Sequence, residues 1–383
     1  MATLISWFFK IFNPGYTSKG SQYIAAHAHR NLAATTKSAP VPAAKLGILS
    51  KSGKTGNAPN HITGQTPENF TGDYNQLPSY VEVRYFDWMA GVSNHNETKN
   101  NLTSDPAFER KIIEYLDVLA ESEYAGANLI PRVPSVMVQL LKRMHEENIS
   151  SSELSRIITK DVVLVAAILS EVNSSYYNLS SKITDLSQAI LLLGHNRLRM
   201  VLAKLSFTPI YNTQLGAYTK LTASKIWDES QKRALVGYLL AKHQKVDPFM
   251  AFLAGLVQDV GLMVALRVFD RSSGNGQLPN SPEFRRWFQQ KSLILSTRIG
   301  QIWSLPEMVI RSIEAQGADR TDLIKLPLAK VLKKADFISK ICILIEDGHL
   351  KVDLERARVI LTDSETDCLF TMLEGQVNVA NIL

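Results

Sequence analysis

Residues 252–261 read FLAGLVQDVG, a run of small and apolar side chains that ends in an amide and a carboxylate, Gln258 and Asp259. The run lies within residues 248–267, where the spacing of the apolar residues predicts a helix. A helix with an apolar face needs a neighbouring element to cover that face. We therefore expect this stretch to pack within a larger set of helices.

Helical spacing of apolar residues continues on both sides of this stretch. It begins at Asp105-Pro106, because Asp is a good N-cap and Pro suits the first position of a helix. Ser150 to Glu153 has the spacing of a capping box, and Gly194 is expected to end a helix. Further helical patterns cover residues 136–144, 161–172, 185–193, 196–206, 222–243, 282–302, 306–316, 326–346 and 365–374. With no convincing alternating strand and no internal repeat, the sequence predicts an all-α protein built as a compact helical bundle.

The composition and charge of the chain indicate which structural and functional classes it can belong to. The chain has 383 residues, with 45% hydrophobic and 20% charged residues, which is typical of a globular protein. Its net charge is +6, but residues 1–60 carry seven basic residues and no acid, so the remainder is close to neutral. A basic tail without a basic folded face argues against a dedicated nucleic-acid-binding domain.

The composition also divides the chain into segments. Residues 1–75 are predicted to form a basic, flexible, disordered tail with a short aromatic segment at its start, and residues 76–104 a linker of uncertain structure. The helical domain is assigned to 105–346, and a helical appendage to 347–383. Residues 1 to about 100 are expected to be dispensable for folding, because they contribute little periodic apolar surface.

The cysteines and the first residues of the chain indicate in which cellular compartment the protein acts. Cys342 and Cys368 form neither a disulfide framework nor a zinc-ligand cluster, which fits a reducing cytoplasm. The start lacks the pattern of a secretory signal, and no apolar run reaches the 18 to 20 residues that a membrane span needs. Residues 4–12 are unusually aromatic. They are interpreted either as a short interfacial helix that contacts a membrane or partner, or as a stretch that folds back or has no role. We expect a cytoplasmic protein, peripheral to a membrane if the first interpretation holds.

Five segments, in order, resemble the bacterial HDOD family. They are residues 129–135 (LIPRVPS), 171–177 (EVNSSYY), 188–199 (QAILLLGHNRLR), 226–230 (IWDES) and 252–261. The resemblance extends from Leu129 to Lys340. It implies an HD-like helical bundle used in signal transduction, related to phosphohydrolases whose histidines and aspartates bind divalent metals.

The resemblance places Glu229 where active HD domains have their first histidine, and Gln258-Asp259 where they have a His-Asp pair. Asp336 is the carboxylate left near the end of the domain. Because a Gln amide is a poor replacement for imidazole, we expect a degenerate site with no catalytic residue, no metal and no cofactor. Asp259 and Asp336 are interpreted as hydrogen-bonding residues. Asp259→Asn is then expected to leave stability unchanged or raise it, since an unpaired carboxylate in a cleft is costly to keep ionised. Trp227 is expected to pack against the helix that carries Gln258.

Six residues are candidates for interaction with a ligand or partner: Asn173, Ser174, Tyr176, Tyr177, Arg197 and Arg199. The turn at 173–177 is interpreted either as an exposed recognition loop or as a loop in which one Tyr packs inward and the Asn caps a helix. The two arginines either hold an anionic group or are solvated at a helix flank.

The function implied is that of a non-catalytic regulatory module. The expected partner is a signalling protein, with a cyclic nucleotide second messenger as another candidate. One alternative is a metal-dependent phosphohydrolase with a rebuilt site, although the missing histidines speak against it. Another is nucleic-acid binding through the basic tail, which would depend steeply on salt and would be lost without residues 1–75.

Overall fold

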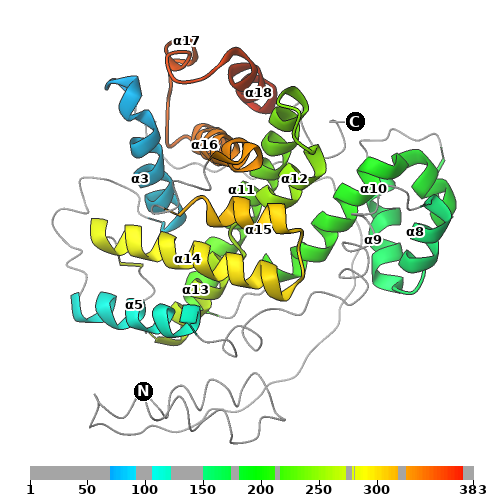
Figure 1. The fold of residues 1–383 in the computed structure, drawn as a ribbon, viewed down its shortest axis with the longest axis horizontal. Coiled ribbons are helices and arrows are strands. Elements are labelled where there is room, and N and C mark those ends of the chain that lie inside the picture. Colours follow the sequence, from blue (N-terminus) through cyan, green and yellow to red (C-terminus); the bar gives the residue numbers. More distant parts are fainter. Residues whose placement is uncertain are drawn as a thin grey trace, which may run out of the picture. The chain divides into compact units, whose positions relative to one another are not determined.

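The computed structural model describes residues 70–91, 106–121, 150–173, 181–211, 216–272, 278–279, 281–317 and 325–373. Within these ranges every secondary-structure element longer than a single residue is a helix (Figure 1), and a backbone hydrogen bond joins the N–H of Phe70 to the carbonyl of Lys351 at 3.0 Å. The prediction of an all-α helical fold is confirmed. The aromatic segment 4–12, the rest of the predicted tail up to residue 69 and the predicted helix 136–144 lie outside the described residues.

Helix α11 (Ala217–His243) is the central element of the fold. It packs against α12 (Pro248–Val257), α13 (Val260–Ser272) and α16 (Pro327–Glu346). Gly255 lets α11 and α12 approach closely, because a Cβ at this position would lie 2.8 Å from the Cα of Ala234. The FLAGLVQDVG segment is therefore fixed against α11 at the level of residues 233 and 234.

The helix expected to run without a break through 248–267 is interrupted at Gln258 and Asp259. The interruption is held by Ser296 of α14 (Pro282–Ile302). The Ser296 hydroxyl donates to the carbonyl of Gln258 at 2.5 Å and accepts from the backbone N–H of Gly261 at 2.8 Å. A side chain thus satisfies backbone groups that a continuous helix would have paired, and the two polar residues lie at the junction of α12 and α13.

The stretch Pro248–Arg271 is long and apolar enough to cross a membrane, contrary to the expectation from sequence. In its most apolar window, however, 94% of the residues are buried inside the protein. In this fold the apolar side chains of α12 and α13 form the core.

Helix α10 (Leu186–Tyr211) is kinked at Gly194, which has φ 68° and ψ 173°. Glycine adopts this positive φ without the strain that a Cβ imposes, so the predicted helix break is confirmed. Two shorter helices, α8 (Ser151–Ile158) and α9 (Val162–Val172), pack against α10. The Ser150 side chain accepts from the N–H of Glu153 at 3.2 Å, as the capping spacing predicted.

An aromatic cluster joins α13 to α14. Phe269 contacts Phe284 and Phe288 edge-on, and the last two rings stack with centroids 5.4 Å apart. Helix α5 (Pro106–Glu121) covers α13 and α14, and α15 (Glu307–Glu314) packs on α12, α14 and α16. This layer holds α14 at a fixed distance from the α12–α13 junction.

The domain assignment is corrected at residues 77–89. These residues, expected to be a linker and dispensable, form α3 (Leu77–Met89), preceded by the 3-10 turn η1 (Tyr74–Gln76). Helix α3 packs on α16 and α11 (Figure 1), with Leu77 and Val81 fully buried. Its Trp88 indole N–H donates to Asp347 Oδ2 at 2.7 Å. The sequence obscured this helix because the apolar patch is short and polar residues flank it.

The segment expected to be a C-terminal appendage also contributes to the core. It contains α17 (Leu354–Ala357) and α18 (Asp363–Leu373), and α18 packs against both α11 and α16. Leu369 and Cys368 are buried there. Residues 350–373 therefore belong to the same packed unit as the central helices.

Candidate functional site

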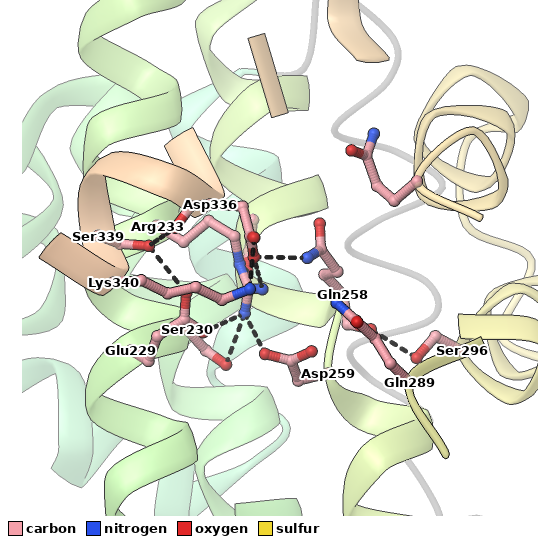
Figure 2. Close-up of polar contacts among 12 residues, drawn as sticks. Glu229, Ser230, Arg233, Gln258, Asp259, Gln289, Ser296, Asp336, Ser339 and Lys340 are labelled. Atoms are coloured by element: carbon pink, nitrogen blue, oxygen red, sulfur yellow. Dashed lines mark hydrogen bonds and ion pairs between the residues drawn. The ribbon is translucent and has the colours of Figure 1, made fainter. Parts of the chain in front are cut away.

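A buried arginine lies where the central helices meet (Figure 2). The Arg233 side chain on α11 is fully buried, and its Nη1 donates to Asp336 Oδ1 at 2.8 Å. Its Nη2 donates to Glu229 Oε2 at 2.5 Å and to Asp259 Oδ2, while Nε donates to the carbonyl of Gly255 at 3.0 Å. One guanidinium therefore links three carboxylates that come from α11, the α12–α13 junction and α16.

The local sequence explains how these groups meet. Glu229 and Arg233 are four residues apart, so they share one face of α11. Ser339 of α16 donates to Glu229 Oε1 at 2.8 Å, which fixes the second oxygen of that carboxylate. Asp259 reaches the guanidinium because the helix is interrupted at this residue. Each carboxylate is thus held by backbone geometry as well as by charge.

A second buried cation borders the first. Lys340 Nζ donates to Asp336 Oδ2 at 2.6 Å and to Glu82 Oε1 at 2.8 Å. Glu82 lies on α3, so this lysine connects α3 with α16. Asp336 therefore lies between two cations, with Arg233 on one oxygen and Lys340 on the other.

These surroundings change the proton affinities of the buried groups. Burial raises the pKa of Glu229 well above its ordinary value, and Arg233 only partly opposes this shift. Burial also raises the pKa of Asp336, but Lys340 and Arg233 outweigh burial and hold that pKa below its usual value. Burial lowers the pKa of Arg233, yet the adjacent carboxylates raise it well above normal. The guanidinium is therefore a permanent charge of the site.

The four positions singled out by the resemblance lie together. Glu229, Asp259 and Asp336 all contact the guanidinium, and Gln258 Nε2 donates to Asp336 Oδ1 at 2.8 Å. Arg233 was not identified from sequence, nor was Lys340 as a site residue. A signal for both was present, because Glu229 to Arg233 and Asp336 to Lys340 each have the i,i+4 spacing of helical ion pairs.

A family model places this arrangement among known proteins. The model of the HDOD domain matches residues 130–318, which include Glu229, Arg233, Gln258 and Asp259. The chain carries an HDOD domain. Helix α3 and the site residues of α16, Asp336 and Lys340, lie outside the matched range, so the site is completed by flanking segments.

A solved structure shares the fold of this HDOD domain. A crystal structure of an HDOD domain protein of unknown function from Geobacter sulfurreducens matches with a TM-score of 0.50 and 18% identity, over 71% of this chain and 95% of its own. A provisionally named metal-dependent phosphohydrolase from Shewanella amazonensis SB2B matches with a TM-score of 0.46 and 15% identity, over 71% of this chain and 100% of its own. At this level of identity the first match shows the fold.

One curated relative matches in sequence. An uncharacterized protein of Treponema pallidum (strain Nichols) is 21% identical over 196 residues, which are 48% of this chain and 37% of the relative. The match thus spans little more than a third of that relative's length.

The residues of the HDOD site do not fit a divalent metal. Among the described residues, no group of three or more His, Cys, Asp or Glu side chains is arranged to hold a metal ion. The three carboxylates point at the guanidinium of Arg233, and Lys340 adds a second positive charge beside Asp336. A divalent cation here would meet two fixed positive charges at once.

A cavity of about 540 Å³ opens beside the ion cluster. Helices α3, α14 and α16 form its walls, and Gln258 and Asp259 lie on its surface. Its size is in the usual range for a small-molecule site. The chain therefore has a pocket beside the four positions that the resemblance singled out, formed by the HDOD domain together with α3 and α16.

Trp227, which was expected to pack against α12, contacts α10. It is half-buried, and its ring packs at a tilt against Tyr211 of α10, with centroids 4.8 Å apart. A polar contact also joins α11 to α12 at this site, through Arg233 and the carbonyl of Gly255.

The candidate interaction residues lie away from the ion cluster in sequence, and part of the group can be described. Asn173 donates to the carbonyls of Leu169 and Ile183, each at 2.7 Å, and accepts from the N–H of Ile183 at 2.8 Å, so it connects the end of α9 to Ile183. Arg199 stacks on Phe249 at 4.1 Å, and burial lowers its pKa. Arg197 is half-buried. The remaining three, Ser174, Tyr176 and Tyr177, lie outside the described residues.

Proposed function

We propose that this HDOD domain is a non-catalytic regulatory module that acts in the cytoplasm by binding a signalling partner or a small ligand. The observation that carries the proposal is the guanidinium of Arg233, which lies at the centre of the carboxylates that the resemblance equates with metal-binding positions. The carboxylates are engaged by a fixed organic cation.

A guanidinium cannot perform the chemistry of a metal in phosphoester hydrolysis. A metal generates hydroxide from bound water and accepts the phosphoryl oxygen as a ligand. Arg233 instead donates to carboxylates and, through Nε, to the carbonyl of Gly255, and a guanidinium does not ionise a bound water as a metal does. Its pKa is raised further by those carboxylates, so it is no general base either.

The ion cluster instead supports a rigid scaffold role. It joins α3, α11, α16 and the α12–α13 junction through charge-assisted hydrogen bonds. A scaffold of this kind presents fixed helical surfaces and a fixed pocket to a partner. Recognition by such a domain then requires no metal and no turnover.

The test is metal analysis and hydrolysis assays on the full chain purified without chelator. We expect substoichiometric metal and no hydrolysis of phosphomonoester or phosphodiester substrates with Mn²⁺ or Mg²⁺ added. Stoichiometric tightly bound iron, manganese or zinc, with hydrolysis that Asp259→Ala abolishes, would show that the domain is an enzyme.

A further inference from the structure

The cavity beside the ion cluster has two polar atoms that the fold does not use. The hydroxyl of Tyr85 and the amide oxygen of Gln258 are both buried and have no hydrogen-bond partner among the described residues. Both residues line the cavity, and their side chains are more than nine-tenths buried. Leaving a buried donor or acceptor unsatisfied costs free energy, so these two atoms point to a ligand.

The Gln258 side chain is oriented by the ion cluster. Its Nε2 is held by Asp336 at 2.8 Å, and Figure 2 shows its Oε1 directed away from that contact. The amide oxygen is therefore available only as an acceptor, while the Tyr85 hydroxyl is available as a donor, since burial raises the pKa of that phenol well above 10.0. A matching ligand offers one donor and one acceptor at its inner edge.

The walls of the cavity are largely aromatic and aliphatic. Phe86 of α3 and Phe288 of α14 meet edge to face with centroids 6.4 Å apart, and Leu262 and Met89 also line the space. Such walls favour a flat ring over a hydrated sugar or a chain of charged groups.

Two exposed cations line the cavity, beside the partly exposed carboxylate of Glu82, which Lys340 binds. Arg286 on α14 and Lys333 on α16 both line it and are exposed to solvent. Exposed cations at the mouth of an apolar pocket favour a ligand whose outer end carries negative charge.

We propose that this cavity binds a nucleotide, with the base against Tyr85 and Gln258 and the phosphate near Arg286 and Lys333. A nucleobase has ring N–H or amino donors next to carbonyl or ring-nitrogen acceptors, so one flat edge satisfies both unused atoms. The inference rests on the proposed function, because a bound nucleotide acts as a signal only if the domain does not consume it.

The test is isothermal titration of the full chain with AMP, GMP, CMP and UMP, beside their four nucleosides and inorganic phosphate. At least one nucleotide is expected to bind, and its nucleoside and phosphate alone are expected to bind at least about tenfold more weakly, which corresponds to about 1.4 kcal/mol. Comparing the nucleotide with its nucleoside and with phosphate separates recognition of the base from recognition of the phosphate.

Two variants and one control tie binding to this cavity. Tyr85→Phe removes the unused hydroxyl and Lys333→Ala removes a cation at the mouth, so each is expected to weaken nucleotide binding about five- to tenfold. Lys330→Ala is the control, because Lys330 is equally exposed on the same helix and does not line the cavity. The melting temperature of Tyr85→Phe without ligand is expected to equal or exceed that of the parent, because the unpaired hydroxyl is removed, and this separates loss of binding from loss of folding.

The proposal is overturned if no nucleotide binds at millimolar concentration, or if binding is unchanged in both variants; the two unused atoms are then hydrated. Chromatography of the titrated samples separates this failure from failure of the proposed function. If a nucleotide binds and is recovered in hydrolysed form, the cavity is a nucleotide-binding site, but the proposed non-catalytic role is wrong. If no nucleotide binds and none is hydrolysed, the proposal of a nucleotide site is wrong, and the proposed regulation through a protein partner still stands.

Discussion

Arg233 and Asp336 are 103 positions apart in the chain, yet the guanidinium Nη1 lies 2.8 Å from the carboxylate Oδ1. This contact joins α11 to α16 beside the point where Lys340 binds the other oxygen of Asp336. A divalent metal bound by carboxylates from several helices would make a cross-link of the same kind. Here the chain supplies the cation itself, so the link between the helices depends on the sequence and not on metal supply.

The first prediction concerns removal of that cation. Arg233→Ala leaves three carboxylates in a buried space without their common partner, and the free energy of unfolding is expected to fall by about 3–5 kcal/mol. Mn²⁺ is expected to raise the melting temperature of the variant, because its carboxylates then lack a cation, and to leave the parent unchanged. Thermal unfolding with and without Mn²⁺ measures both effects.

The control for Arg233→Ala is Lys232→Ala, the adjacent residue on the same helix. Lys232 pairs with Glu346 at 2.8 Å, but both side chains are partly exposed, so its loss is expected to change stability little. An equal Mn²⁺ stabilisation of the parent and of Arg233→Ala would contradict the view that the guanidinium fills the cation position.

The second prediction reverses an expectation from sequence. Asp259 was expected to tolerate Asp259→Asn without loss, but its carboxylate binds the buried guanidinium. The neutral amide removes a charge-assisted hydrogen bond, so the free energy of unfolding is expected to fall by about 1–3 kcal/mol. Urea unfolding at neutral pH measures it. Asp363→Asn, at a side chain that is 93% exposed, is the control and is expected to change little. A variant at 259 as stable as the parent would mean that this ion pair contributes nothing.

The third prediction concerns α3. A chain that begins at Pro67 is expected to keep the melting temperature of the full chain, whereas a chain that begins at Thr103 is expected to melt markedly lower or to aggregate. The second truncation removes the buried side chains of Leu77, Val81 and Trp88 and exposes the apolar surface of α16 and α11 that they cover. Circular dichroism melting of the three chains is the measurement. Equal melting temperatures for all three would restore the sequence-based view that residues 1–100 are dispensable.

The helices were predictable from sequence where local signals were strong. The capping spacing at Ser150 and the helix-ending Gly194 both correspond to the observed backbone. The interruption at Gln258 and Asp259 was not predictable, because it depends on Ser296, which lies 38 residues away from Gln258. Helix α3 was missed for the same reason: its stability comes from contacts with α16 and from Asp347, both distant in sequence.

The candidate site was predictable in part. The resemblance identified Glu229, Gln258, Asp259 and Asp336, which the fold brings together. The central residue of the site, Arg233, has no counterpart among the metal-binding positions that the resemblance supplied. The resemblance therefore gave no reason to single it out. Its i,i+4 spacing to Glu229 was visible, but such pairs are common on exposed helix faces, and only burial gives this one a special role.

The last prediction uses the pH dependence of Glu229→Gln. Burial raises the pKa of Glu229 well above 4.5, so the folded protein retains a proton at pH values where the unfolded chain has lost it. Stability therefore falls as pH rises from about 4.5 through the folded pKa, with a limiting slope of about 1.4 kcal/mol per pH unit. Glutamine has no such proton, so the stability of the variant relative to the parent is expected to improve from pH 5 to pH 8.

The pKa shift of Asp336 changes the pH dependence of stability in the opposite direction, and this decides the pH range of the Glu229→Gln experiment. Because Lys340 and Arg233 hold its pKa below 3.8 despite burial, its stabilising contribution is present above that pH and is lost as pH falls below it. Urea unfolding between pH 5 and pH 8 therefore separates the effect of Glu229 from that of Asp336. Glu355→Gln, at a side chain that is 75% exposed, controls for loss of one negative charge. If the pH profiles of Glu229→Gln and the parent run parallel across this range, the carboxylate is ionised throughout, and Arg233 outweighs burial at this position.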